Sequence, residues 1–337
     1  MKNIAINGFG RIGRLFLRSA LQDSSMQVVA INDLGNIENL AYLFKYDSVY
    51  GAYKGEISVS GDSLIIDGRT IQFLQERDAS KLPWGSMNVD VVLECTGVFE
   101  SFEQANVHIA SGAKHVIISA PAKDADGVRD GKTVLMGIND DDIAKHPITS
   151  NASCTTNASA PVIQVMNETI GVEKAVLNTV HAYTATQNIV DGPTKGSDYR
   201  RGRAGAFNIS PSTTGAALAV SRVVKELEGK FDGVAMRVPT ISGSVADITF
   251  ISKRPTTVEE VNSLLTEASK MERWSGILGV TNEQLVSSDI LGMPFGAIVD
   301  LGFTKVVGGN LVKVLSWYDN EAGYVSTLIK HVKKAFK

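Results

Sequence analysis

The chain has 337 residues and a mass of 36.1 kDa, which is typical of about two domains. Apolar residues make up 44% and charged residues 20% of it, which excludes an intrinsically disordered chain. The net charge of -3 argues against nucleic-acid binding through bulk positive charge as a primary role.

The cysteine content and the absence of a targeting pattern favour the cytoplasm. Cys95 and Cys154 are too few for a disulfide scaffold or a four-thiolate zinc site. No secretory signal pattern and no apolar run of about 18 residues, the length of a membrane helix, is found in the sequence. We therefore expect a cytoplasmic protein with no membrane role.

The first 120 residues alternate short apolar segments with helical patterns. The apolar segments lie at Asn3–Asn7, Gln27–Asn32, Asp90–Glu94 and His115–Ser119, and the helical patterns at Ile12–Ala20, Ile37–Tyr46 and Phe102–Ala110. Continuous apolar segments separated by helices are typical of a parallel sheet covered on both faces. Between them, Asp67-Gly68 separates two apolar runs within Ser63–Leu74 and predicts a hairpin.

The pattern changes after residue 150. Alternating segments predict strands at Lys174–Thr184, Phe231–Pro239, Val245–Lys253, Ala297–Val307 and Leu311–Tyr318. Helices are predicted at Thr155–Ile170, Ser212–Leu227, Thr257–Met271 and Glu321–Phe336. The segment Gln187–Ile209 has no periodicity, and a loop of this length inside a domain is commonly functional. We expect an α+β domain with a mostly antiparallel sheet.

The GFGRIG segment at Gly8–Gly13 matches the GxGxxG pattern between a predicted strand and a predicted helix. Its glycines would permit a tight turn, a close approach of the backbone to a pyrophosphate, and close packing of helix on strand. Asp33 ends the next strand, where its carboxylate can accept both ribose hydroxyls and would repel a 2′-phosphate. The pattern predicts a Rossmann domain that prefers NAD to NADP. The alternative is a structural glycine turn with a surface aspartate.

Cys154 stands at the predicted start of a helix, where free N–H groups and the helix dipole favour a thiolate. A thiolate attacks a carbonyl carbon readily. From the residues alone, Cys154 could equally be a buried core residue. Cys95 lies in an apolar strand and is interpreted as buried and inert.

Among the five histidines, His181 is the candidate for chemistry. It lies where a predicted strand enters the long loop, and it can act as a base only if it meets Cys154 in space. A structural role is the alternative. Surface or capping roles are expected for His108, His115, His146 and His331. No cluster has metal-ligand spacing, so no metal site is predicted.

Gly8–Gly13, Cys95, Cys154 and His181 lie within eight ordered motifs. Through these motifs the sequence resembles the phosphorylating glyceraldehyde-3-phosphate dehydrogenases. The resemblance covers essentially the whole chain. The motifs are INGFGRIGR, ECTGVF, ISAPAK, SNASCTTNASAP, TVHAYTATQ, STTGAA, MRVPT and WYDNEAGY. It implies an NAD-binding Rossmann domain at 1–153, a catalytic domain at 154–320, and a C-terminal helix at 321–337 that returns to the Rossmann domain. It also implies a homotetramer.

The resemblance implies the oxidation of D-glyceraldehyde 3-phosphate to 1,3-bisphosphoglycerate, a step of glycolysis and gluconeogenesis, with NAD as cofactor and inorganic phosphate as second substrate. Cys154 would attack the aldehyde, and His181 would act as general base. A thioester on Cys154 would keep the oxidation energy until phosphate attacks it.

By the same resemblance, three groups of residues bind ligands. The cofactor would be bound by Gly8, Gly10, Arg11, Ile12, Gly13, Asp33, Arg77, Ser119 and Asn320. Thr184 and Arg237 would hold the substrate phosphate. The attacking phosphate would be held by Ser153, Thr155, Arg201, Thr214 and Gly215.

Two other functions stay open at this point. One is erythrose-4-phosphate dehydrogenase, a related enzyme that releases its acid by hydrolysis, although HAYTATQ and STTGAA resemble the phosphorylating enzyme more. The other is a protein that binds NAD but acts mainly through interactions with other proteins.

Overall fold

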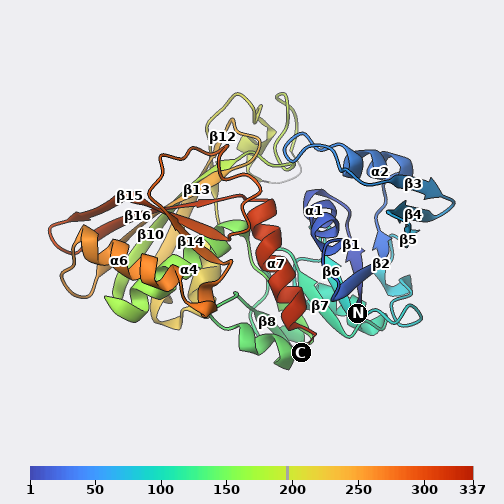
Figure 1. Ribbon diagram of the computed structural model, residues 1–337, viewed down its shortest axis with the longest axis horizontal. Coiled ribbons are helices and arrows are strands. Elements are labelled where there is room, and N and C mark those ends of the chain that lie inside the picture. Colours follow the sequence, from blue (N-terminus) through green and yellow to red (C-terminus); the bar gives the residue numbers. More distant parts are fainter. Residues whose placement is uncertain (195–196, 337) are drawn as a thin grey trace. The chain divides into compact units, whose positions relative to one another are not determined.

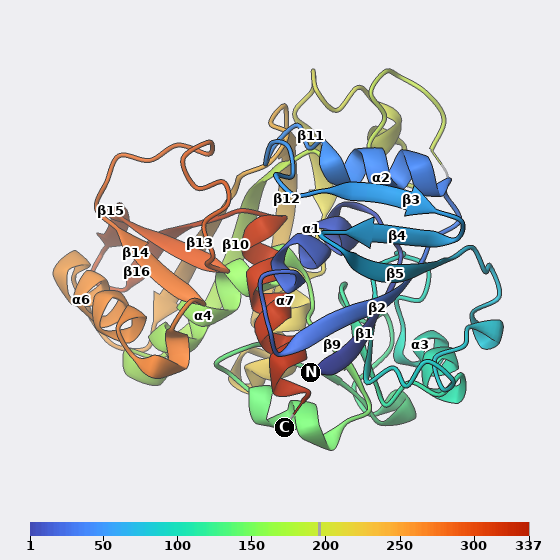
Figure 2. The same ribbon diagram turned by 45° about the vertical axis from the view of Figure 1, so that its right-hand side comes forward.

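The computed structural model describes residues 1–194 and 197–336, so residues 195 and 196 of the predicted loop Gln187–Ile209 lie outside the described residues, as does residue 337. The chain forms two compact units, Met1–Ala152 with Leu328–Lys337 and Ser153–Thr327. Each has its own sheet (Figures 1 and 2). Within the described residues, no helix is both long and apolar enough to span a bilayer.

The first unit contains a nine-stranded sheet in the order β3-β4-β5-β2-β1-β6-β7-β9-β8. Its strands are β1 (Lys2–Asn7), β2 (Met26–Asn32), β3 (Ile57–Ser60), β4 (Ser63–Ile66), β5 (Arg69–Leu74), β6 (Val91–Glu94), β7 (His115–Ile118), β8 (Gly131–Thr133) and β9 (Ile148–Ser150), and its helices include α1 (Arg11–Ala20), α2 (Ile37–Lys45) and α3 (Phe102–Ala110). The strands pair in parallel except around β4. β2 and β6 flank β1, so the strand order reverses there, which places the binding crevice of such sheets at their carboxyl ends.

Local sequence explains the edge of this sheet. β4 and β5 form the predicted hairpin, and Figure 2 shows β3, β4 and β5 as neighbouring strands. Asp67 and Gly68 between them have φ values of 49° and 75°, as a type I′ turn requires. In the middle of the sheet β6 and β7 are wholly buried, as their continuous apolar sequences predict.

The second unit contains a seven-stranded sheet in the order β11-β12-β10-β13-β16-β15-β14. Its strands are β10 (Val172–Ala182), β11 (Ser210–Thr213), β12 (Phe231–Val238), β13 (Ser244–Ser252), β14 (Leu278–Thr281), β15 (Ala297–Val307) and β16 (Leu311–Tyr318). Four of the six pairings are antiparallel, which confirms the mostly antiparallel prediction. Its helices α4 (Cys154–Thr169), α5 (Ala216–Val223) and α6 (Val258–Ser269) contact the sheet, and α4 and α6 lie along the same side of it (Figures 1 and 2).

The structure corrects one helix prediction. The helix expected at Ser212–Leu227 begins only at Ala216, because Ser210–Thr213 forms the edge strand β11 against β12. The final helix, expected at Glu321–Phe336, is α7 (Ala322–Lys334). The short strands β8, β9 and β14 were not predicted, because three or four residues carry too little periodicity.

Three histidines that were expected at surface or capping positions are buried: His108, His115 and His331. Nε2 of His115 and Nε2 of His331 lie 2.9 and 2.8 Å from the hydroxyl of Thr149. Nδ1 of His331 lies 3.0 Å from Oδ1 of Asn151, so it donates there and Nε2 accepts from Thr149. The ring is therefore satisfied only as the neutral form.

The buried imidazoles make stability depend on pH. Burial lowers the pKa of His331 from 6.5 to about 3 and that of His115 to about 4. Below pH 6.5 the unfolded chain binds more protons, so the stability present above that pH is lost as pH falls toward the folded pKa values.

We expect His331→Gln to reduce the slope of unfolding free energy against pH, between pH 6.5 and 4, by up to about 1.4 kcal/mol per pH unit. Urea unfolding at several pH values measures this slope. His146→Gln, which removes an imidazole that is not buried, is the control. An unchanged slope in His331→Gln would contradict the assignment.

Candidate active site

A cavity of about 400 Å³ opens at the carboxyl ends of β1, β2 and β6. It is lined by residues that end or follow these three strands and by three that follow β5. They are Asn7, Gly8, Gly10, Asn32, Asp33, Leu34, Glu76, Arg77, Ala79, Cys95, Thr96, Val98 and Phe99. Four predicted cofactor residues, Gly8, Gly10, Asp33 and Arg77, thus lie around one cavity. The cavity lies where the strand order reverses, which is the position at which doubly wound sheets bind nucleotides.

The glycines of the GxGxxG segment have separate structural reasons. Gly8 has a φ of +97°, and a Cβ there would lie 2.7 Å from the backbone of Cys95. A Cβ on Gly13 would lie 2.3 Å from the carbonyl oxygen of Gly8. Gly10, the N-cap of α1, has open space around it, so a ligand can approach the free N–H groups of the helix. Arg11 and Ile12 begin that helix, and the Arg11 side chain pairs with Asp47.

The Asp33 carboxylate is fixed by backbone donors. Oδ2 accepts from the N–H of Phe9 at 2.7 Å, and Oδ1 accepts from the N–H of Gly35 at 2.8 Å. Each oxygen keeps a further lone pair, so the carboxylate can still accept two ribose hydroxyls. This geometry fits NAD.

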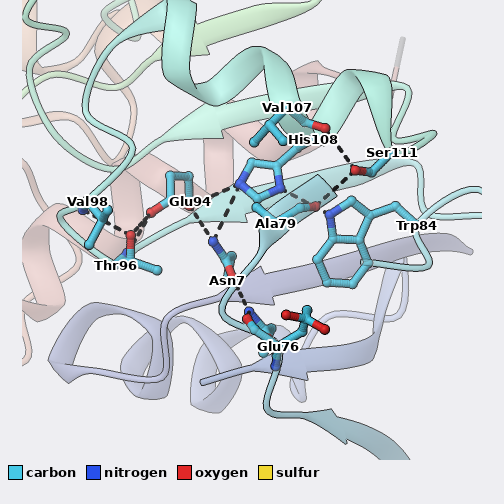
Figure 3. Close-up of polar contacts among 11 residues, drawn as sticks. Asn7, Glu76, Ala79, Trp84, Glu94, Thr96, Val98, Val107, His108 and Ser111 are labelled. Atoms are coloured by element: carbon cyan, nitrogen blue, oxygen red, sulfur yellow. Dashed lines mark hydrogen bonds and ion pairs between the residues drawn. The ribbon is translucent and has the colours of Figure 1, made fainter. Parts of the chain in front are cut away.

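A polar network, drawn in Figure 3, includes residues that line this cavity. Trp84 Nε1 donates to Nδ1 of His108 at 3.1 Å, so the hydrogen of the neutral ring is on Nε2 and is donated to Glu94. Glu94 also accepts from the side chain of Asn7 at 2.6 Å and from the N–H of Thr96 at 2.7 Å. The buried carboxylate thereby holds two cavity-lining residues in place.

Cys95 differs from its prediction in one respect. It is partly accessible and lines the cavity, although a buried core position was expected. Its inertness is consistent with the structure, because desolvation raises the pKa of the thiol to about 12. Ser119, at the end of β7, is hydrogen-bonded to this thiol.

In the second unit, α4 and β10 bring a thiol and an imidazole together. Cys154 is the first residue of α4, and Sγ lies 3.4 Å from Nε2 of His181 in β10. Ser153 is the N-cap of α4, and its hydroxyl accepts from the N–H of Thr156. Cys154 is partly accessible, whereas His181 is 4% exposed. His181 therefore lies next to Cys154, which a role as its base requires.

Two further side chains contact the imidazole. β10 and β12 pair in parallel with His181 opposite Arg237, and Nη1 of Arg237 lies 2.5 Å from Nδ1 of the ring. The ring edge packs on Tyr318 at a centroid distance of 5.8 Å. The Tyr318 hydroxyl bonds to those of Thr155 and Thr179 at 2.8 and 2.7 Å. Sequence reasoning missed Tyr318, although it lies in the WYDNEAGY motif.

Burial affects both members of this pair. Burial raises the pKa of the Cys154 thiol, and the Arg237 charge and hydrogen bonds at the helix start oppose this only in part. Burial, and secondly the Arg237 charge, lower the pKa of His181 to about 3. The helix terminus thus does not by itself ionise the thiol, because desolvation outweighs it.

Comparison with known proteins identifies the family. Residues 2–102 match the NAD-binding domain of glyceraldehyde 3-phosphate dehydrogenase, and residues 153–320 match its C-terminal domain. The chain is 46% identical over 334 residues to a glyceraldehyde-3-phosphate dehydrogenase of Clostridium pasteurianum, covering 98% of this chain and 97% of that one. It is 48% identical over 328 residues to that of Priestia megaterium, covering 97% and 96%. The chain belongs to the glyceraldehyde-3-phosphate dehydrogenase family.

The anion-binding residues that the family resemblance implies fall into two places. Arg201, in the short helix η4 (Tyr199–Gly202), and Arg237 line one pocket with Thr186 and Ser212. Thr184 is adjacent, because its hydroxyl bonds to that of Thr186 at 3.0 Å.

The remaining members of this set are placed differently. Thr214 and Gly215 precede α5 and line another pocket, with Val176 and Phe231. The Thr155 hydroxyl is 2.8 Å from that of Tyr318, and the side chain is buried. Asn320 is fixed through Oδ1, which accepts from the N–H of Gly243 and the hydroxyl of Ser244.

The two thiols of this family member should differ in alkylation rate. Cys154 has an imidazole at 3.4 Å and a cationic neighbour, whereas the Cys95 pKa of about 12 leaves it almost without thiolate. We expect iodoacetamide at neutral pH to modify Cys154 at least about tenfold faster than Cys95. Peptide mass spectrometry over time measures both rates. Equal rates would mean that the surroundings of Cys154 do not activate it.

Proposed function

We propose that this chain is an NAD-dependent, phosphorylating glyceraldehyde-3-phosphate dehydrogenase. The observation that carries the proposal is the 3.4 Å approach of Cys154 Sγ to His181 Nε2 at the start of α4. Membership of the family supports it, since curated members in Clostridium, Streptomyces and Priestia bear this name. No observation favours erythrose 4-phosphate as the substrate.

In the proposed reaction, Cys154 and His181 act on the aldehyde in turn. His181 takes the thiol proton as Sγ attacks the carbonyl carbon and returns it to the resulting oxyanion, so that a hemithioacetal forms and the ring is again neutral. The ring then accepts the hydroxyl proton as the carbon is oxidised, which leaves a thioester on Cys154. The backbone N–H of Cys154 and the ring of His181 would stabilise the oxyanion of each tetrahedral state.

The cavity in the first unit would hold the cofactor. Asp33 would accept the ribose hydroxyls, Gly8–Gly13 would face the pyrophosphate, and Arg77 would lie by the adenine. Ser119 and Asn320 would contact the nicotinamide. Bound NAD supplies a hydride acceptor for the aldehyde carbon.

Phosphate recognition would use the arginines of the second unit. Arg237 and Thr184 would bind the substrate phosphate, because Arg237 is close to His181 and its guanidinium can form paired hydrogen bonds with phosphate. Ser153, Thr155, Arg201, Thr214 and Gly215 would bind the attacking phosphate. The engaged Thr155 hydroxyl would then contribute only after it leaves Tyr318.

NADH formation from D-glyceraldehyde 3-phosphate, measured with and without inorganic phosphate, tests the proposal. We expect turnover only with phosphate, and NAD to be used in preference to NADP. Turnover that is indifferent to phosphate would favour a hydrolytic enzyme, and erythrose 4-phosphate serves as the parallel substrate.

We also propose a cytoplasmic homotetramer, as in the family resemblance. The support in this chain is a partly apolar sheet face that is exposed in the single chain. Val176, Val234 and Leu311, which share that face by register, are 60%, 49% and 42% exposed. Light scattering should give four times the 36.1 kDa chain mass. A monomer at micromolar concentration would contradict this.

A further inference from the structure

A row of three polar side chains lies at the carboxyl ends of neighbouring strands in the first unit. Asn32, Asn7 and Glu94 are the last residues of β2, β1 and β6, and the parallel register pairs Asn7 with each of the other two. All three are buried. Asn7 and Asn32 also line the cavity at these strand ends. The row thus links a buried carboxylate to the wall of the cavity.

A backbone donor fixes the direction of the hydrogen bonds along this row. The N–H of Glu76 donates to Oδ1 of Asn32 at 2.9 Å, which identifies this atom as the amide oxygen. Nδ2 of Asn32 donates to the carbonyl oxygen of Glu76 at 3.0 Å and to Oδ1 of Asn7 at 2.7 Å. Nδ2 of Asn7 then donates to Oε2 of Glu94 at 2.6 Å. The orientation of both amides follows from one N–H, and the row reaches Glu94 with a donor.

A second series of hydrogen bonds reaches Glu94 from α3 (Figure 3). The indole of Trp84 can only donate, and it donates to Nδ1 of His108 at 3.1 Å, so the ring hydrogen is on Nε2. Nε2 donates to Oε2 of Glu94 at 3.1 Å. Because Nε2 and Nδ2 of Asn7, which are 3.4 Å apart, are both donors, they share this oxygen. The other carboxylate oxygen accepts from the N–H of Thr96 at 2.7 Å. Each of these partners donates, so the position requires an ionised carboxylate, and an amide would turn its N–H groups toward another donor.

We propose that Glu94 is a positioning residue for cofactor binding, which holds Arg77 in place through a series of hydrogen bonds of fixed direction. The carboxylate orients Asn7, and Asn7 orients Asn32. Asn32 bonds to both the N–H and the carbonyl oxygen of Glu76, the residue before Arg77. The inference rests on the proposed function, in which Arg77 lies by the adenine of NAD. Glu94 would thus strengthen cofactor binding without touching the cofactor.

Glu94→Gln keeps the size of the side chain and replaces an acceptor by an amide. We expect it to bind NAD roughly tenfold or more weakly than the wild type, because a buried donor then lacks its acceptor and ordering the Arg77 segment costs binding free energy. ADP-ribose, which lacks the nicotinamide, should lose affinity by the same factor. Calorimetric titration measures both ligands. Glu103→Gln is the matched control, because it removes an exposed carboxylate of the same unit, paired with Arg129, and it should bind both ligands like the wild type.

A second substitution separates the direction of the hydrogen bonds from the packing of the side chain. Asn7→Asp alone sets two carboxylates against each other and should also weaken NAD binding. When it is combined with Glu94→Gln, the carboxylate and the amide exchange places. The new amide can then donate to the new carboxylate, which still accepts from Asn32. We expect the double variant to bind NAD within about threefold of the wild type, a coupling that a double-mutant cycle measures. Losses that simply add would show that Glu94 acts by packing alone and would overturn the proposal.

A measurement on the wild type keeps the proposal testable if the single variants do not fold. Nitrogen-15 NMR of histidine-labelled protein, with His108 assigned by its proximity to the Trp84 indole hydrogen, reports which ring nitrogen is protonated. We expect a protonated Nε2 and an unprotonated Nδ1, with and without NAD. A protonated Nδ1 overturns the inference, as does an unchanged NAD affinity in Glu94→Gln. A wild-type protein that does not bind NAD would instead refute the proposed function on which the inference rests.

Discussion

Cys154→Ser is expected to lower the rate of NADH formation from glyceraldehyde 3-phosphate by about 10⁴-fold or more, as removal of catalytic nucleophiles does in other enzymes. A serine hydroxyl has a far higher pKa than a thiol, and an oxygen ester would replace the thioester. The cofactor cavity is lined by residues of the first unit, so NAD affinity should change by less than about threefold, or roughly 0.7 kcal/mol.

Stopped-flow absorbance of NADH and calorimetric titration of NAD measure these two quantities. Cys154→Ala is the matched variant, because it lacks any hydroxyl that could act as a weak nucleophile. Similar losses in both variants would assign the whole effect to the missing sulfur. Substantial activity in Cys154→Ala would exclude the covalent mechanism.

His181→Asn is expected to slow the NADH burst by about 10²- to 10⁴-fold, the range for loss of a general base. The asparagine amide can still donate to the Ala182 carbonyl but cannot accept the thiol proton at the position of Nε2. The iodoacetamide rate at Cys154 should fall as well, since the nearest proton acceptor is lost. Single-turnover kinetics and alkylation measure the two effects.

Tyr318→Phe is the control for the packing of the imidazole. It keeps the aromatic ring, whose centroid lies 5.8 Å from that of His181, and removes only the hydroxyl that bridges Thr155 and Thr179. We expect a loss of less than about thirtyfold, because two neutral hydrogen bonds of roughly 1 kcal/mol each are removed. A Tyr318→Phe loss as large as that of His181→Asn would show that the tyrosine hydroxyl contributes to the rate as much as the imidazole does.

Sequence patterns predicted most of the strands, the hairpin and the glycine turn because each depends on neighbouring residues. Asp67 and Gly68 specify their turn by their own conformational preferences, and Gly8 is needed for a positive φ. The apolar continuity of Val91–Glu94 likewise required no knowledge of the tertiary fold. The family, fold class and cofactor followed from motifs of this local kind and are confirmed by the matched domains and relatives.

The errors arose where distant segments meet. His331, in the C-terminal helix, is hydrogen-bonded to Thr149 and Asn151, which are about half the chain away in sequence. His115 is hydrogen-bonded to the same Thr149 hydroxyl. The burial of both imidazoles thus depends on contacts that no local pattern shows. One clue was available for His108, which follows Phe102 and Ala105 on the buried face of α3. The raised pKa of the Cys154 thiol could not be predicted either. The sequence indicates that a helix starts there, but it does not indicate how strongly the surrounding residues desolvate the thiol.

Mass spectrometry of the enzyme quenched after a phosphate-free burst tests the central claim most directly. One 3-phosphoglyceroyl group per NADH formed is expected on the peptide that contains Cys154, and it should disappear when phosphate is added. Stoichiometric NADH without this adduct, or an adduct on another residue, would contradict a thioester mechanism at Cys154.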